Sequence, residues 1–158
     1  MTVAAIVAGD GEFASRYLLV EEEARDGLRL NQPAGHLEPG ESLVDAVIRE
    51  ALEETACSFA PTGLLGVYLC RSLANARDEV EREVTYLRFA FVGRIGEPDT
   101  ERALDDGIVR TLWMTLAEIR ASAARHRSPL VLQCVEDHAR GKAIAPLDVL
   151  FTHSTALA

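Results

Sequence analysis

The segment REALEETA, residues 49–56, contains three glutamates within five positions. On a helix, Glu50, Glu53 and Glu54 fall at i, i+3 and i+4, so they lie on one face within about one turn. Like charges at this spacing destabilise a helix, each pair by roughly a few tenths of a kcal/mol. A hard divalent cation such as Mg²⁺ reverses this effect, because it binds carboxylate oxygens together with water and substrate phosphates. The cluster is consistent with a metal site completed by a phosphorylated ligand. Taken alone, however, the triplet favours a solvated acidic helix face over a metal site.

Arg49, Glu41 and a glycine-containing loop lie close to this cluster in the sequence. Arg49 follows Glu41 by eight residues, about two helical turns, so its guanidinium can reach back toward that carboxylate. Arginine binds a carboxylate through two parallel hydrogen bonds and can hold it in place. Gly35 and Gly40 have no side chain, which allows backbone carbonyls of the loop to approach a metal closely. We therefore expect the loop and the helix to form one unit.

The segments around this cluster carry the hydrophobic patterns of a helix and of several strands. An apolar stripe at helical spacing predicts a helix from Glu41 to about Glu54, formed by Val44, Val47, Ile48 and Ala51. Runs rich in apolar, aromatic or β-branched residues predict strands at 2–9, 15–23, 64–72, 83–94 and 109–114. The segment 28–41, which contains several prolines and glycines, is predicted as a loop, and the polar segment 73–83 as a mobile link.

The C-terminal part of the chain contains helix start signals. Thr115, with a glutamate three residues later, forms a capping box that begins a helix. Ser128 and Pro129 are predicted as the N-cap and first-turn proline of the last helix. The segment 147–151 is a candidate final strand. This order of elements predicts one α/β domain over residues 1–158, with a mixed sheet and helices on both faces.

Composition and charge exclude several classes of protein. The 158 residues suit one compact domain, and no apolar run approaches the roughly 18 residues that cross a bilayer. The N-terminus lacks the pattern of a signal peptide, so a cytoplasmic protein is expected. Cys57, Cys70 and Cys134 form no CxxC pair, which argues against disulfides and a zinc site. A net charge of −9 repels nucleic acid, although a small polyphosphate can bind through metal ions.

The residues from Gly35 to Cys57 resemble the Nudix box, GX5EX7REUXEEXGU, in which U is aliphatic. Every charged position of the box matches at its spacing. The resemblance implies the Nudix fold, an α/β/α sandwich with a mixed β-sheet and a catalytic loop-helix-loop. It also implies an enzyme that hydrolyses the phosphoanhydride bonds of a nucleoside diphosphate linked to another group, or of a related pyrophosphate. Mg²⁺ is the expected ion, with Mn²⁺ as a substitute.

The same resemblance assigns roles to individual residues. Glu50, Glu53 and Glu54 would bind the divalent metal, with Glu50 or a neighbour as a candidate base and the Gly35 carbonyl as a further ligand. Glu41 and Arg49 would hold the loop-helix-loop together. The departure from the box is Ala56, which stands where the family has glycine. If that position has a positive φ, alanine costs on the order of 1 kcal/mol there.

A narrower resemblance links the chain to the NudJ-type phosphatases of the Nudix superfamily. It lies in NQPAGHLE (31–38) and RSPLV (127–131), with further similar segments at 85–91 and around 146–150. It implies release of phosphate from nucleoside tri- and diphosphates, from hydroxymethylpyrimidine pyrophosphate and from thiamine pyrophosphate. The substrate is then a small nucleotide or pyrophosphate. From the charge and the absence of a long apolar run, we expect no nucleic acid or membrane partner; we further expect a monomer or a homodimer.

Other polar residues are candidates for contacts with the substrate or the metal. His36 could touch phosphate or base, or make a loop hydrogen bond; Arg88 could point into the cleft and neutralise phosphate. Arg127 could face the substrate, although it and Ser128 are favoured as a helix cap. A later carboxylate often completes Nudix sites, and each candidate for it has surface charge as its alternative: Glu79, Glu81, Glu83, Asp105 and Asp106.

Two rival functions remain from the sequence. One is a Nudix pyrophosphohydrolase that cuts inside the phosphate chain, for example on ADP-ribose or an oxidised nucleotide. The other is a Nudix-fold module that senses a nucleotide without hydrolysing it. The intact glutamates argue against the sensor, because a protein that only binds its ligand can lose them freely.

Overall fold

The computed structural model describes residues 1–75 and 81–157 of the chain. Its strands are β1 (Thr2–Ile6), β2 (Arg16–Ala24), β3 (Gly27–Asn31), β4 (Ala34–His36), β5 (Cys57–Asn75), β6 (Glu81–Pro98) and β7 (Ile108–Thr115). Its α-helices are α1 (Leu43–Thr55), α2 (Leu116–Ala121) and α3 (Leu130–Ala139). Short 3₁₀ helices are η1 (Gly11–Phe13), η2 (Ala123–Arg125), η3 (Leu147–Val149) and η4 (Ser154–Ala156).

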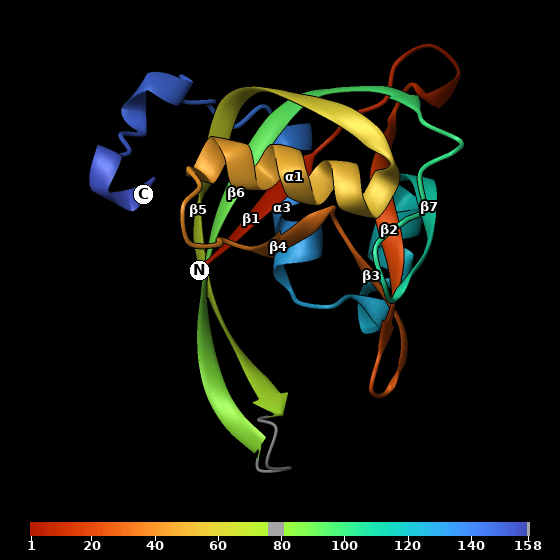
Figure 1. The fold of residues 1–158 in the computed structure, drawn as a ribbon. Helices are drawn as coiled ribbons and strands as arrows, with labels where there is room; N and C mark the ends of the chain where they lie inside the picture. The colour runs from red at the N-terminus through yellow and green to blue at the C-terminus, as the bar shows by residue number, and fades with distance from the viewer. Residues whose placement is uncertain (76–80, 158) are drawn as a thin grey trace.

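The strands form two sheets (Figure 1). The larger sheet has four strands in the order β4-β1-β6-β5, and the smaller has three in the order β3-β2-β7. β1 pairs with β6 in parallel, and every other pairing given for these sheets is antiparallel. The mixed pairing predicted from the sequence is therefore present, but the strands divide into two sheets instead of one.

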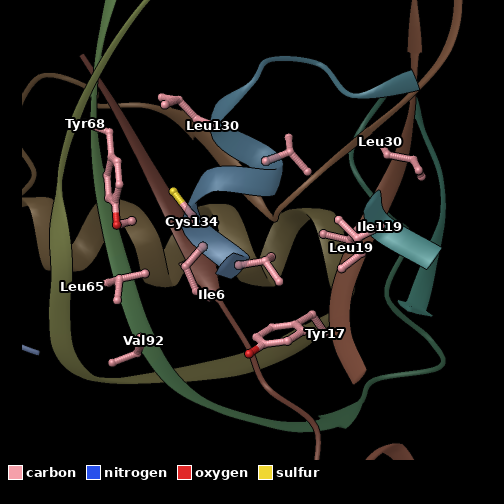
Figure 2. Packing of buried hydrophobic residues seen from close by; sticks show 13 residues of the cluster. Ile6, Tyr17, Leu19, Leu30, Leu65, Tyr68, Val92, Ile119, Leu130 and Cys134 are labelled. Carbon is pink, nitrogen blue, oxygen red and sulfur yellow. The ribbon is translucent and has the colours of Figure 1, made fainter. Parts of the chain in front are cut away.

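Apolar side chains are buried on both faces of the larger sheet. On one face, α1 buries Val47 and Ala51 against Val3 and Phe91. On the other face, α3 packs with α2, and Figure 2 shows Ile6, Tyr17, Leu19 and Cys134 gathered there. All five residues of β1 are buried, as expected for a continuous apolar strand covered on both sides. The arrangement is the predicted α/β/α sandwich.

Helix α1 begins and ends with identifiable local signals. Ser42 is its N-cap, and Ser42 and Asp45 form a reciprocal capping box, so the helix starts after the predicted Glu41. Ala56 is its C-cap and adopts the left-handed conformation, with φ 56° and ψ 19°. The strain expected for alanine in place of glycine is therefore present in the backbone.

Several element predictions differ from the structure. The predicted loop 28–41 holds most of β3 and all of β4, because hairpin pairing with β2 and long-range pairing with β1 satisfy its backbone. The segment 147–151 is not a strand, since Leu147–Val149 forms a 3₁₀ turn. The link predicted at 73–83 is strand at its two ends, and 76–80 lies outside the described residues.

The capping signals of the last two helices had different outcomes. Thr115 caps α2 through the predicted box. Pro129, not Ser128, is the N-cap of α3, and no side chain caps that helix. Among the described residues, no helix is long and apolar enough to cross a membrane.

Candidate active site

Arg49 lies at the centre of an ion-pair network that joins α1 to the preceding loop. Its Nε donates to Glu41 Oε2 at 3.0 Å, and its Nη2 donates to Glu41 Oε1 at 2.7 Å, the paired geometry suggested by the eight-residue spacing. Its Nη1 donates to Glu50 Oε1 at 2.8 Å and to Glu53 Oε2 at 3.0 Å. Two glutamate side chains of α1 therefore converge on one cationic group.

Glu54 faces β4 instead of Arg49. Its Oε2 accepts a hydrogen bond from the Ala34 backbone N–H at 2.9 Å, and the residue is only 6% exposed. Burial, with a smaller effect of the nearby carboxylates of Glu22, Glu50 and Asp105, raises the pKa of Glu54 to about 8 against the opposing Ala34 hydrogen bond. Among the described residues, no Lys or Arg lies within ion-pair distance of Glu54. This carboxylate therefore stands in a site that favours a positive ion.

Gly35 brings β4 against the carboxyl group of Glu50. A Cβ at this position would overlap that carboxyl, so only glycine permits the approach. Burial also raises the pKa of Glu50, while Arg49 opposes this shift. The loop-helix unit thus encloses buried carboxylates against the backbone of β4.

The donor set of this unit fits a hard divalent cation. Glu50, Glu53 and Glu54 offer carboxylate oxygens only, which are the ligands that Mg²⁺ and Mn²⁺ accept. As the side chains stand, the described residues contain no group of three or more carboxylate, His or Cys side chains close enough to hold a metal. The reason is that Arg49 holds Glu50 and Glu53, while Glu54 turns to Ala34. Metal binding here would require these carboxylates to exchange partners.

Arg88 lies on the α3 side of the larger sheet and is held by two amides. Its Nη1 donates to Gln32 Oε1 at 3.1 Å and its Nη2 to Asn31 Oδ1 at 3.4 Å. Gln32 in turn donates to the Val131 carbonyl in α3 at 2.7 Å. Arg88 is 7% exposed, burial lowers the pKa of its guanidinium, and its Nε has no hydrogen-bond partner. The structure thus buries Arg88 between strand β6 and helix α3; the sequence analysis left open whether it points into the cleft.

Glu22 is a carboxylate of this region that the sequence analysis missed. Arg127 Nε lies 3.3 Å from Glu22 Oε1, and burial raises the pKa of Glu22 against the opposing effects of Arg127, Arg88 and Asn31. The charge of Glu22 is also one of the causes that raise the pKa of Glu54. Strand alternation does not single it out, because β2 is buried on both faces from Tyr17 to Glu21.

The other candidate residues occupy different places. Asp105 donates its backbone N–H to the Glu53 carbonyl at 2.8 Å, beside the end of α1, and Asp106 is exposed. Glu83 pairs weakly with Arg71 at 3.8 Å on β5 and β6. Glu79 lies outside the described residues, as does the side chain of Glu81. The carbonyl of His36, not its exposed ring, accepts from Arg49 Nη2 at 3.0 Å.

Comparison with known families identifies this arrangement. The family model described as the NUDIX domain matches residues 1–134, from β1 into α3. The chain belongs to the NUDIX family. The matched residues include the loop-helix unit, in which Arg49 ties Glu41 to Glu50 and Glu53. The chain is therefore a hydrolase that acts on phosphoanhydride bonds.

Individual NUDIX proteins resemble the chain over most of its length. Phosphatase NudJ from Escherichia coli K12 is 33% identical over 150 residues, which cover 95% of this chain and 89% of NudJ. The solved structure of a NUDIX hydrolase from Nitrosomonas europaea is 49% identical, with a TM-score of 0.83 over 96% of this chain and 95% of that one. The NUDIX domain of Shewanella oneidensis NrtR, solved with ADP ribose, is 16% identical with a TM-score of 0.62 over 88% of this chain and 85% of that one, and shares the fold alone.

Proposed function

We propose that this protein is a divalent-metal-dependent phosphatase that removes terminal phosphate from small pyrophosphate compounds. The observation that carries the proposal is the set of α1 carboxylates around Glu54, which is buried among like charges with no cationic side chain described beside it. A buried anion without a partner is costly, and a bound cation removes that cost. Similarity to phosphatase NudJ supports removal of single phosphates.

Each residue of the loop-helix unit has a proposed role. Glu50, Glu53 and Glu54 hold the ion, with the Gly35 carbonyl as a further ligand, and Arg49 with Glu41 fixes the loop against the helix. When bound, a divalent ion neutralises phosphate oxygens and lowers the pKa of a coordinated water. Glu50 or a neighbouring carboxylate takes the proton from the attacking water, because it lies within the same cluster. Mg²⁺ is the proposed ion, and Mn²⁺ its substitute.

The proposed substrates are nucleoside tri- and diphosphates, hydroxymethylpyrimidine pyrophosphate and thiamine pyrophosphate. These follow from the resemblance to the NudJ-type phosphatases. His36 and Arg127 are proposed to contact the substrate, since both side chains are largely exposed beside the loop and the β2–β3 hairpin. One domain over residues 1–158 is proposed to carry out the whole reaction.

Product analysis tests this proposal. The protein with Mg²⁺ is incubated with each proposed substrate and with ADP-ribose, and products are resolved by phosphorus NMR. We expect orthophosphate and the substrate shortened by one phosphate. Pyrophosphate or two monophosphates would contradict the phosphatase and favour the rival pyrophosphohydrolase. Ligand-induced stabilisation without any phosphate release, across the whole panel, would favour the sensor.

A further inference from the structure

The connection between β3 and β4 is held by a buried side-chain network on the α3 side of the larger sheet. Arg88 of β6 donates to Gln32 Oε1 at 3.1 Å and to Asn31 Oδ1 at 3.4 Å. Gln32 is 1% exposed and donates through Nε2 to the Val131 carbonyl of α3 at 2.7 Å. One arginine and one glutamine therefore tie this connection to β6 and to α3.

Packing alone does not account for an arginine at this place. Arg88 is 7% exposed, both of its hydrogen bonds go to neutral amides, and its Nε has no partner. Burial of a charge costs free energy, and apolar side chains of similar volume often replace buried ionic groups without loss of stability. What arginine adds is two directed hydrogen bonds, which hold the adjacent residues Asn31 and Gln32 in one position.

The other end of the same connection faces the glutamates of α1. Ala34 donates its backbone N–H to Glu54 Oε2 at 2.9 Å. Gly35 lies so close to the carboxyl group of Glu50 that a Cβ there would overlap it. Two of the three glutamates proposed to hold the metal therefore meet backbone that begins two residues after Gln32.

Pro33 makes the segment between Gln32 and Ala34 stiff. Its ring fixes its own φ and restricts the residue before it to extended conformations. Its carbonyl accepts from the Ala5 N–H at 2.9 Å, so backbone pairing with β1 holds the segment within the sheet. The contacts of Gln32 hold it from the α3 side, and a displacement of Gln32 also displaces Ala34 because little backbone freedom lies between them.

We propose that Arg88 and Gln32 are positioning residues for the metal site at α1. From the α3 side of the sheet they hold the β3–β4 connection, so that the backbone at Ala34 and Gly35 meets the glutamates of α1. This inference rests on the proposed function, and it gives Arg88 an indirect role in place of contact with substrate phosphate. Partners that orient metal ligands typically affect metal affinity or activity by about 10–100-fold.

The test measures Mn²⁺ affinity without substrate, by isothermal titration calorimetry, for wild type, R88M and Q32M. Methionine fills the space of either side chain but removes its hydrogen bonds. Both variants should bind Mn²⁺ at least about tenfold more weakly than wild type. R88K keeps a donor and should recover part of the affinity. Circular dichroism confirms that each variant is folded; if R88M does not fold, Q32M and R88K decide the same question.

Phosphate release separates positioning from direct contact with the substrate. For R88M, the Mg²⁺ concentration that gives half the maximal rate should rise about tenfold, while KM at saturating Mg²⁺ should stay within about twofold of wild type. If Arg88 instead contacts substrate phosphate, KM at saturating Mg²⁺ rises and the Mn²⁺ affinity without substrate is unchanged. That result would overturn the inference.

Y68F provides the matched control. Tyr68 of β5 donates to Asp137 Oδ2 of α3 at 2.9 Å, a buried hydrogen bond between sheet and helix that does not involve the β3–β4 connection. Y68F should lose stability but keep the wild-type Mn²⁺ affinity. An equal loss of affinity in Y68F, or wild-type affinity in both R88M and Q32M, would reduce the network to a structural tie. Absence of Mn²⁺ binding by wild type would instead contradict the proposed function, so the two failures are distinguishable.

Discussion

At the scale of single residues, the three glutamates of α1 occupy different environments. Glu50 and Glu54 are 8% and 6% exposed, while the side chain of Glu53 is 34% exposed and pairs with Arg49. Burial without a cation affects Glu54 most strongly and raises its pKa to about 8. In the metal-free protein, the ionised Glu54 carboxylate should therefore destabilise the folded state.

This strain predicts a pH dependence of stability in the metal-free protein. Because the folded protein holds a proton on Glu54 up to about pH 8, while the unfolded chain loses it near 4.5, the folded state binds more protons between these values. The free energy of unfolding in EDTA should fall as pH rises through this window, and E54Q should reduce the slope. Denaturant titrations at several pH values measure it. Equal slopes for wild type and E54Q would contradict the prediction. E101Q serves as the control: because Glu101 is exposed, this substitution should leave the slope unchanged.

Sequence spacing was sufficient to predict the residues of α1 but not those opposite them. Glu50, Glu53 and Glu54 share a helix face because the helical period is fixed, and Arg49 reaches Glu41 for the same reason. Glu22 and Arg88 both lie beside Asn31 only because strands distant in the sequence pack around it, and no local pattern records that packing.

At the scale of elements, Arg49 joins the loop after β4 to α1. Replacing it by alanine leaves Glu41, Glu50 and Glu53 without their shared cation. Since the Arg49 side chain is partly exposed, R49A should lower the free energy of unfolding in EDTA by about 2 kcal/mol. R49K should lower it less, because lysine keeps the charge but not the paired geometry. Added Mg²⁺ should recover part of the loss, and an unchanged midpoint for R49A in urea would contradict this role.

The left-handed C-cap of α1 gives a second prediction at this scale. In A56G, glycine relieves about 1 kcal/mol of backbone strain, whereas the loss of a buried methyl costs about 0.8 kcal/mol. The two effects nearly cancel because Ala56 is only 5% exposed, so stability should change by less than about 1 kcal/mol. Urea titration checks the change. By contrast, A56V should lower the free energy of unfolding by more than about 2 kcal/mol, because a β-branched residue is strained at positive φ. If A56V were as stable as wild type, the left-handed backbone at this position would be contradicted.

Local signals at element ends had mixed success, and the difference is physical. Thr115 caps α2 as predicted because a capping box involves only four consecutive residues. Ser128 does not cap α3, because the helix begins one residue later, at Pro129, and the Ser128 hydroxyl makes no hydrogen bond to it. The strand β4 was missed because its pairing partner, β1, lies far away in the sequence. The strand β3 forms a hairpin with the preceding β2 and was missed because the prolines and glycines that follow it favour a loop.

At the scale of the whole molecule, the larger sheet separates two apolar clusters. Phe91 and Val92 are neighbours in β6, yet Phe91 belongs to the α1 side and Val92 to the α3 side. Alternation along one strand therefore couples both clusters, and neither helix can leave without exposing the sheet they share. The sandwich was predictable from this alternation. The split into two sheets was not, because it depends on register between distant strands.

This coupling predicts one cooperative unfolding transition. Far-UV circular dichroism follows all elements, and the single Trp113 reports fluorescence from β7 in the smaller sheet. Both probes should give the same midpoint. F91A, which empties a fully buried position, should lower stability by about 3–5 kcal/mol and shift both probes equally. Separate midpoints for the two probes would show that the sheets unfold independently.

The central claim is that the carboxylates of α1 carry hydrolysis through a divalent ion. The most direct test is phosphate release by the double variant E53Q/E54Q in saturating Mg²⁺, compared with wild type and with E101Q. Both substitutions keep side-chain volume while removing the charges that hold the ion, so turnover should fall by at least about a hundredfold. E101Q should match wild type. Turnover by the double variant at the wild-type rate would contradict the account.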